Sequence, residues 1–279
     1  MTHNVPDLFY RQKPHEIGIE CLDLAAFARR LCAGRGDPKT PKRVHFHCFI
    51  LPDTDGLHTI DFERIAFQAG DILYVGPGQI HSWTLTPETA GTMVLVEPAF
   101  LDSRLPILRN DLPFFWRHRR CWSLSQREIV REITVLMKQE IQARLDRRTL
   151  GLLLAHWLET ITPATLGNLR PRDIARHLKL RALVDAHLLE HQPLGFYADR
   201  LGLTPDRFSL FVKRLWGISG KSWLDQEMAV EAKRRLVTED ASVAAIGEAL
   251  GFKETTHFVR FFKRLTGETP AQFRRTTSV

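Results

Sequence analysis

The sequence predicts an α+β protein in which an N-terminal antiparallel β-barrel with flanking helices precedes an all-α region with two helix-turn-helix motifs. Three observations predict this arrangement: short β-rich runs in the N-terminal part, two amphipathic stretches near the middle, and one pattern that occurs twice near the C-terminus. With 279 residues, of which 44% are hydrophobic, the chain is long enough for two packed domains.

Residues 44–97 consist of short runs rich in β-branched and aromatic residues, separated by turn sequences at 52–56 and 76–78. Short strands at regular spacing favour a small antiparallel barrel. Within this region, Gly70–Trp83 resembles the second motif of cupin barrels, and the run from His45 to His47 resembles the first. The resemblance implies a cupin-like, effector-sensing barrel over residues 1–120.

A barrel of this kind offers a pocket for a small-molecule effector. His47, His81 and Trp83 would supply polar and aromatic contacts there, with His45 beside them. Arg43, just before the strand, would pair with an effector carboxylate. A solvated arginine and hydrogen-bonded polar residues at the barrel mouth account for the same residues without a ligand, so both interpretations stay open.

His45, His47 and His81 also raise the hypothesis of a zinc or iron site, because imidazole binds both metals. Metal-binding cupins add a glutamate shortly after the paired histidines, whereas residues 48–52 read Cys-Phe-Ile-Leu-Pro. We therefore expect no metal, no cofactor and no catalytic residue. A metal-dependent cupin enzyme fused to a DNA-binding module is one alternative.

Residues 121–161 are expected to be helical, because apolar residues recur there at helical spacing. The two apolar stripes are Ile129, Ile133, Leu136 and Met137, and Leu150, Leu154, Trp157 and Leu158. Packing against the barrel and formation of a dimer interface both account for these stripes. Residues 162–171, which contain proline and glycine, are typical of a linker.

Residues 208–217 and 258–267 repeat one pattern, with six of the ten positions identical, and each copy follows an apolar stretch that ends in Leu-Gly. In each copy four apolar residues fall at i, i+3, i+4 and i+7, which places them on one face of a helix. A short helix, a glycine turn and a second helix form a helix-turn-helix, whose second helix enters the major groove of DNA. One face of that helix packs, and the other is free to contact bases.

The second copy and its surroundings contain a Gly-Phe turn, a Phe-x-x-x-Phe-Lys core, a Gly-x-x-Pro and an aromatic-Arg end. These elements are Gly251-Phe252, Phe258, Phe262-Lys263, Gly267, Pro270 and Phe273-Arg274. Through them the segment 192–275 resembles the DNA-binding domain of the AraC/XylS transcriptional regulators. The resemblance implies a seven-helix domain over residues 172–279, in which a long helix at about 221–237 joins two recognition helices.

The same resemblance implies a sequence-specific regulator of transcription, an activator rather than a repressor. It further implies a homodimer that binds double-stranded DNA, responds to a small-molecule effector and contacts RNA polymerase. An effector-independent regulator, in which the barrel serves only dimerisation, is the other alternative.

The free faces of the two recognition helices hold the predicted DNA-binding residues. They are Asp206, Ser209, Leu210, Lys213 and Arg214 in the first copy, and Thr255, Thr256, Val259, Arg260 and Lys263 in the second. Arg260 suits guanine, because a guanidinium contacts O6 and N7 together. Leu210 stands where the second copy has Arg260, so either the first helix reads methyl groups and shape or the second helix supplies most of the discrimination.

Charge and composition agree with a nucleic-acid partner. The net charge is +7, and an excess of five positive charges lies within residues 172–276. The cysteines have neither metal-binding nor redox spacing; they are Cys21, Cys32, Cys48 and Cys121. Without a membrane-length apolar stretch or a signal-peptide pattern, we expect a bacterial cytoplasmic, nucleoid-associated protein.

Overall fold

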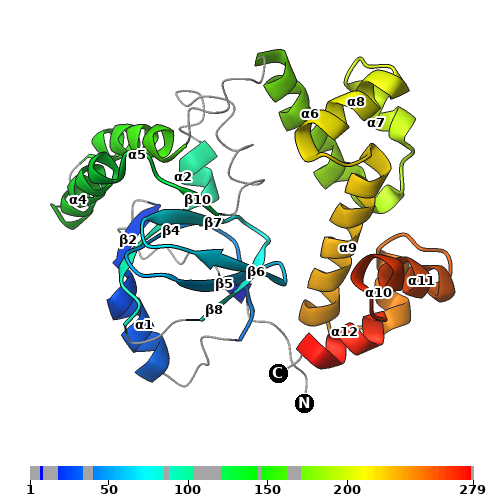
Figure 1. Ribbon diagram of the computed structural model, residues 1–279, viewed down its shortest axis with the longest axis horizontal. Coiled ribbons are helices and arrows are strands. Elements are labelled where there is room, and N and C mark those ends of the chain that lie inside the picture. Colours follow the sequence, from blue (N-terminus) through cyan, green and yellow to red (C-terminus); the bar gives the residue numbers. More distant parts are fainter. Residues whose placement is uncertain are drawn as a thin grey trace. The chain divides into compact units, whose positions relative to one another are not determined.

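The computed structural model describes residues 7–8, 18–33, 40–84, 88–102, 121–143, 146–162 and 171–277. The chain forms two compact units that divide between Ile174 and Ala175 (Figure 1). The predicted linker at 162–171 lies mostly outside the described residues. In the ranges given above, no helix is both long and apolar enough to cross a membrane.

The first unit is built on two five-stranded sheets. The strand order of one sheet is β1 (Asp7–Leu8), β3 (Lys42–Val44), β8 (Ile80–Trp83), β5 (Gly56–Ile60) and β6 (Glu63–Phe67). The order of the other is β10 (Cys121–Ser123), β7 (Asp71–Val75), β4 (His47–Pro52), β9 (Gly91–Val96) and β2 (Ile19–Asp23). All the described strand pairs are antiparallel except β1 with β3. The predicted antiparallel architecture is confirmed, but as two sheets rather than one closed barrel.

The hydrophobic core of this unit is built from residues of both sheets. One sheet contributes Val44, Ile60 and Trp83, and the other contributes Ile50 and Leu73, none of them more than 5% exposed. Because successive strand residues point to opposite faces, each sheet buries every second side chain in this core. Helix α1 (Leu24–Ala33) adds Leu24 and Phe27 to the core.

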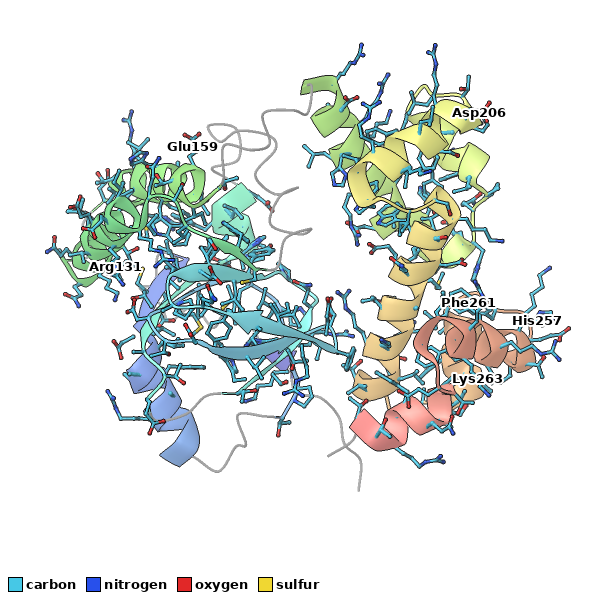
Figure 2. The ribbon with its side chains drawn as sticks, viewed as in Figure 1. Arg131, Glu159, Asp206, His257, Phe261 and Lys263 are labelled. Atoms are coloured by element: carbon cyan, nitrogen blue, oxygen red, sulfur yellow. The ribbon has the colours of Figure 1, made fainter. Side chains whose placement is uncertain are left out.

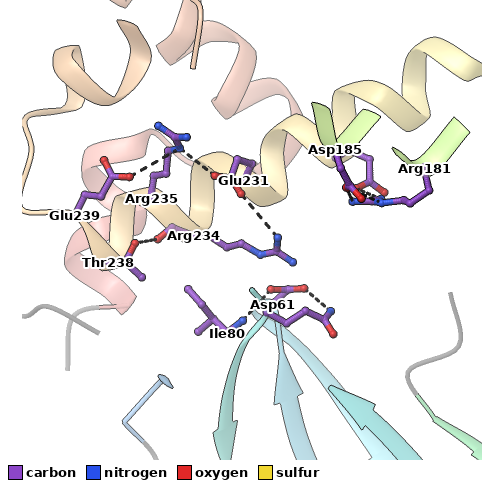
Figure 3. Close-up of polar contacts among 11 residues, drawn as sticks. Asp61, Ile80, Arg181, Asp185, Glu231, Arg234, Arg235, Thr238 and Glu239 are labelled. Carbon is purple, nitrogen blue, oxygen red and sulfur yellow. Dashed lines mark hydrogen bonds and ion pairs between the residues drawn. The ribbon is translucent and has the colours of Figure 1, made fainter. Parts of the chain in front are cut away.

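A tight turn joins β5 to β6 and carries a buried carboxylate. Asp61 and Phe62 both have positive φ, +47° and +69°, as a two-residue hairpin turn of type I′ requires. The Asp61 carboxylate accepts hydrogen bonds from the Ile80 backbone N–H at 3.2 Å and from Gln79 Nε2 at 2.7 Å (Figure 3). These bonds satisfy the carboxylate, which is 4% exposed, and join the turn to the start of β8.

Helices α4 (Arg127–Ala143) and α5 (Arg147–Ile161) lie side by side against the second sheet (Figure 1). The Trp157 ring meets Phe49 of β4 edge-on at 5.3 Å, and its Nε1–H donates to Thr134 Oγ1 of α4 at 2.9 Å. One tryptophan therefore fastens both helices to the sheet. Asp146 caps α5 by accepting from the backbone N–H groups of Arg148 and Thr149.

The predicted stripe of α5 is confirmed, since Leu150, Leu154, Trp157 and Leu158 are all buried. The stripe expected in α4 is divided between two surfaces. Ile133 and Met137 are buried, whereas Ile129 and Leu136 are 42% and 47% exposed. The buried face also contains Val130 and Thr134, and Thr134 Oγ1 accepts the hydrogen bond from the Trp157 indole.

Over the described residues the second unit has seven α-helices, as the resemblance implied. They are α6 (Pro171–His187), α7 (Leu194–Arg200), α8 (Pro205–Trp216), α9 (Gly220–Thr238), α10 (Val243–Ala249), α11 (Thr255–Thr266) and α12 (Pro270–Thr277), with the 3₁₀ turn η3 (Leu188–Glu190) after α6. Helix α9 runs from the group α6–α8 to the group α10–α12 (Figure 1). It confirms the long helix predicted at 221–237.

Ion pairs along α9 support this rod-like element. Arg235 contacts Glu231 one turn before it, at 3.0 Å, and Glu239 one turn after it, at 3.9 Å (Figure 3). Residues four apart face each other on a helix, so the pair of Arg235 with Glu231 favours the helical state, whereas Glu239 is the extended residue that ends α9. Arg181 of α6 also reaches Glu227 of α9 at 2.6 Å, which attaches the first helix of the unit to the rod.

Candidate nucleic-acid interface and inter-sheet cavity

The first helix-turn-helix consists of α7, a turn at Leu201–Leu203, and α8. Gly202 takes a φ of +63°, which lets the chain reverse at once after α7. The Thr204 side chain accepts from the Arg207 backbone N–H and starts α8. Phe208, with Phe211 and Val212, is buried against α7 and α9, as the sequence predicts.

The second helix-turn-helix repeats this design with α10 and α11. Gly251 makes the turn with a φ of +85°, and Phe252 packs on Phe258 and Phe261 at ring distances of 5.3 and 5.1 Å. Phe262 is fully buried and meets Phe273 of α12 at 5.6 Å. The predicted apolar face of each recognition helix is therefore the face that packs.

The opposite faces of α8 and α11 are exposed and carry the ten residues predicted to bind DNA. In α8 these are Asp206, Ser209, Leu210, Lys213 and Arg214; in α11 they are Thr255, Thr256, Val259, Arg260 and Lys263, with Val259 partly buried. The labelled side chains of Asp206 and His257 project outward from these helices (Figure 2). Leu210 is 63% exposed, which is unusual for a large apolar residue.

Contacts with α9 and with His191, which follows η3, hold the second motif in place. Arg264 of α11 is paired with Asp225 of α9 at 2.9 Å. His191 Nε2–H donates to the Leu250 carbonyl oxygen at 2.8 Å, and its ring lies edge-on to Phe252 at 4.8 Å. These contacts were not foreseen, because they join residues far apart in the sequence. The second motif is thus held by α9, which pairs with α11, and by His191, which contacts the end of α10 and the turn after it.

The first unit contains a cavity of about 300 Å³ next to the inter-sheet core. Trp83 and His58 form part of its wall, together with apolar residues of both sheets. His58 Nε2 and His81 Nδ1 share a hydrogen bond of 3.2 Å, and His58 meets the Trp83 ring edge-on at 4.6 Å. Burial lowers the pKa of His81 to about 3, and burial together with His81 lowers the pKa of His58, so both imidazoles are neutral near pH 7.

The predicted effector residues are not brought together. Trp83 lines the cavity and His81 contacts a residue that does, whereas Arg43, His45 and His47 are absent from its lining. His47 instead shares a 2.8 Å hydrogen bond with Tyr74 Oη and stacks on that ring. Phe46 packs in the core, and His45 and Phe46 form the bend between β3 and β4.

His58 is the cavity residue that sequence reasoning missed. It lies in no recognisable motif, and the available signal was strand alternation alone. The pairing of β5 with β8 sets His58 opposite Trp83 and Ile60 opposite His81, so the two histidines are diagonal neighbours on one face.

Possible metal ligands do not cluster in the described ranges, where no three His, Cys, Asp or Glu side chains lie close enough to hold an ion. Burial raises the pKa of Cys48, and burial next to other groups raises the pKa of Cys21 and Cys121 to about 12. These three thiols stay protonated and are weak nucleophiles.

Residues 197–276, which span both motifs, match the family model described as a helix-turn-helix domain. The arabinose operon regulatory protein of Salmonella typhimurium is 33% identical over 238 residues, or 79% of this chain and 80% of that protein. The chain belongs to the AraC/XylS family of transcriptional regulators. It is therefore a DNA-binding regulator of transcription.

Two further relatives differ in how much they share. The HTH-type transcriptional activator RhaS of Escherichia fergusonii is 23% identical over 86% of this chain and 91% of its own length. The regulatory protein PocR of Salmonella typhimurium is 32% identical over 38% of this chain, and the match covers only 34% of PocR. Each of these relatives is named as a regulator or an activator.

Proposed function

We propose that this regulator is a sequence-specific transcriptional activator that works as a homodimer under the control of a small-molecule effector. The observation that carries the proposal is the pair of exposed helix faces, on α8 and α11, attached to one long helix. Helices held in this way enter successive major-groove segments about 34 Å apart on one side of the duplex.

Arg260 is proposed to read guanine, and Leu210 to contact thymine methyl groups. Arg260 is exposed on α11, so its guanidinium can meet O6 and N7 of one guanine. Leu210 has no polar atom in its side chain, and only apolar contact is open to it. Thr255, Thr256 and Val259 would touch methyl groups, and Lys213 and Lys263 would contact phosphates.

This assignment is tested by selecting binding sites from a random DNA pool and measuring two variants on the selected site and on unrelated DNA. Arg260→Ala should reduce by about 1–3 kcal/mol the difference in binding free energy between the selected site and unrelated DNA. Leu210→Ala should lose less, because a methyl contact is weaker than a bidentate hydrogen bond. The opposite ranking would contradict the assignment.

The inter-sheet cavity is proposed as the effector site. It is of the size expected for a small ligand, and it has an aromatic wall with a polar histidine. Control requires that the effector bind one arrangement of the dimer more tightly than another. An effector should therefore raise the melting temperature of the protein and also change transcription. If ligands raise the melting temperature but never change transcription, the cavity has no regulatory role.

The exposed faces of α4 and α5 are proposed as the dimer interface. Four large apolar side chains are exposed on this helix pair by 42–56%: Ile129, Val135, Leu136 and Leu152. Large apolar side chains that are exposed on a pair of neighbouring helices favour burial against a partner. Sedimentation should show a dimer that Leu136→Glu converts to a monomer, while the exposed substitution Glu128→Gln, on the same helix, leaves it unchanged.

Activation is the last part of the proposal. It is supported by the name of RhaS, a transcriptional activator that aligns over most of this chain. An activator must contact RNA polymerase, so we propose polymerase as a further partner. Transcription from a promoter that carries the selected site should rise when the regulator and its effector are added, and a fall would indicate a repressor.

A further inference from the structure

Two ring nitrogens in the wall of the inter-sheet cavity make no hydrogen bond to a described residue. His58 and Trp83 line the cavity and are 1% and 5% exposed. Because His58 Nε2 bonds His81 Nδ1, these two nitrogens are His58 Nδ1 and Trp83 Nε1. Of the nitrogens in the three rings, only His81 Nε2 is both without a partner and closed off from solvent. The other two can therefore be reached through the cavity.

The hydrogen bond between the two histidines couples their proton positions. Both rings are neutral near pH 7, so each carries one N–H. If His58 Nε2–H donates to His81 Nδ1, the proton of His81 must lie on Nε2. If His81 Nδ1–H donates to His58 Nε2, then His81 Nε2 is a lone pair and the proton of His58 lies on Nδ1.

The surroundings of His81 Nε2 favour the second arrangement. This atom is closed off from solvent and has no hydrogen-bond partner among the described residues. A buried N–H without an acceptor is rarer in proteins than an acceptor with an unused lone pair. His81 Nδ1–H is therefore the donor, and His58 presents Nδ1–H to the cavity. Trp83 adds a second donor, because an indole nitrogen can only donate.

The remainder of the interior is apolar. Leu24, Ile50, Phe67 and Leu73 line it, and no lysine or arginine is among the described residues of the lining. A ligand carboxylate placed here would lose its hydration without gaining an opposite charge, which is costly. An uncharged acceptor loses far less and can still satisfy the ring N–H groups.

We propose that the effector is an uncharged molecule whose acceptor oxygen, a carbonyl or an ether, accepts from His58 Nδ1–H, with Trp83 Nε1–H as a second donor. Its hydrocarbon body packs against Phe67 and the other apolar residues of the lining. His81 is a positioning residue, which keeps the proton of His58 on Nδ1. The proposal rests on the cavity being the effector site, and it replaces the effector carboxylate expected from Arg43.

The proton positions can be measured directly on the full chain. Nitrogen-15 NMR of histidine-labelled protein at pH 7 distinguishes Nδ1–H from Nε2–H, and both His58 and His81 should be of the Nδ1–H form. In His81→Phe the donor to His58 is lost, so Nε2–H should appear in His58. Nε2–H in both rings of the unaltered protein would overturn the proposal, because His58 would then present an acceptor.

Matched probes test the ligand. Acetophenone and α-methylstyrene have nearly the same shape, but only acetophenone has an acceptor oxygen; indole and indene differ by an N–H donor. Calorimetry should give about three- to tenfold tighter binding for acetophenone than for α-methylstyrene, which is the effect of one net hydrogen bond. Indole should not gain over indene, and benzoate should bind more weakly than acetophenone.

Substitutions connect this preference to the two rings. His58→Phe and Trp83→Phe each remove an N–H but keep an aromatic ring, so each should reduce the preference for acetophenone, and together they should abolish it. His156→Gln, on α5 and outside the cavity, is the matched control and should leave the preference unchanged. A preference that survives both ring substitutions would overturn the proposal.

The outcomes separate the ligand class from the existence of the site. Leu57 lines the cavity and is 37% exposed, so Leu57→Trp should fill the mouth without disturbing the core. Equal binding of acetophenone and α-methylstyrene, or tightest binding of indole or benzoate, would overturn the acceptor if Leu57→Trp abolishes it, and would leave the effector cavity standing. Binding of no probe, or binding that Leu57→Trp does not affect, would overturn both.

Discussion

The buried pair His58–His81 makes the stability of the first unit sensitive to acid. In the unfolded chain a histidine takes up a proton near pH 6.5, whereas His81 in the folded unit does so only near pH 3. Between these values the unfolded state binds more protons, so the free energy of unfolding falls as the pH falls. Above pH 6.5 neither state is protonated at this site, and His81 contributes no pH dependence.

The size of the effect follows from the separation of the two pKa values. At pH 5 the unfolded state gains about 2 kcal/mol relative to the folded state from His81 alone, since one pH unit corresponds to about 1.4 kcal/mol. His58 acts in the same direction, because burial and His81 lower its pKa as well. A loss of this size is a large fraction of the stability of an ordinary domain.

Urea unfolding between pH 5 and pH 8, followed by tryptophan fluorescence, measures this loss. His81→Gln keeps a polar group beside His58 but cannot take up a proton. Between pH 5 and 6.5, the slope of its unfolding free energy against pH should therefore be smaller by about 1.4 kcal/mol per pH unit, which corresponds to one proton. His156→Gln, on α5 and outside the pair, is the matched control and should leave the slope as it is. A His81→Gln profile as steep as that of the unaltered protein would refute the reasoning.

Two further predictions concern single contacts. Gly251 and Gly267 both have a φ of +85°, but an added Cβ lies 2.3 Å from the Leu189 carbonyl oxygen at Gly251 and within 4 Å of nothing at Gly267. Denaturation should therefore show Gly267→Ala costing about 1–2 kcal/mol and Gly251→Ala clearly more; equal costs would contradict the close approach. Trp157→Phe should lower stability by about 1–3 kcal/mol, because Thr134 Oγ1 loses its donor, and the helix content measured by circular dichroism should persist.

The helix-turn-helix motifs could be predicted because their information is local. Packing of Phe258 and Phe262 follows from helical spacing, and the duplicate in α8 removed the ambiguity of a single match. The resemblance added the long helix α9, which no period in the sequence indicates. What the sequence did not provide was the contact of His191 with Leu250, since nothing local marks two residues that meet through the fold.

The first unit was predicted less completely, because its cavity also depends on contacts between residues that are far apart in the sequence. Strand runs were visible, but the cavity depends on register, which decides that His58 lies beside His81. His45 and His47 have the spacing of a shared strand face, yet His45 lies in the bend between β3 and β4, and His47 bonds Tyr74 instead of lining the cavity. In α4, helical spacing marked Ile133 and Met137 but gave no sign that Val130 and Thr134 would be buried beside them.

The hydrogen bond between His191 and the Leu250 carbonyl affects which DNA binding sites the regulator tolerates. It closes a ring of contacts through α9, Asp225 and Arg264, so the two reading helices cannot swing apart without breaking several interactions. If the two DNA segments that α8 and α11 contact are slightly misplaced in a binding site, the duplex must then bend or twist to bring them to the helices. The base pairs between these segments, which no side chain touches, would influence affinity through their stiffness.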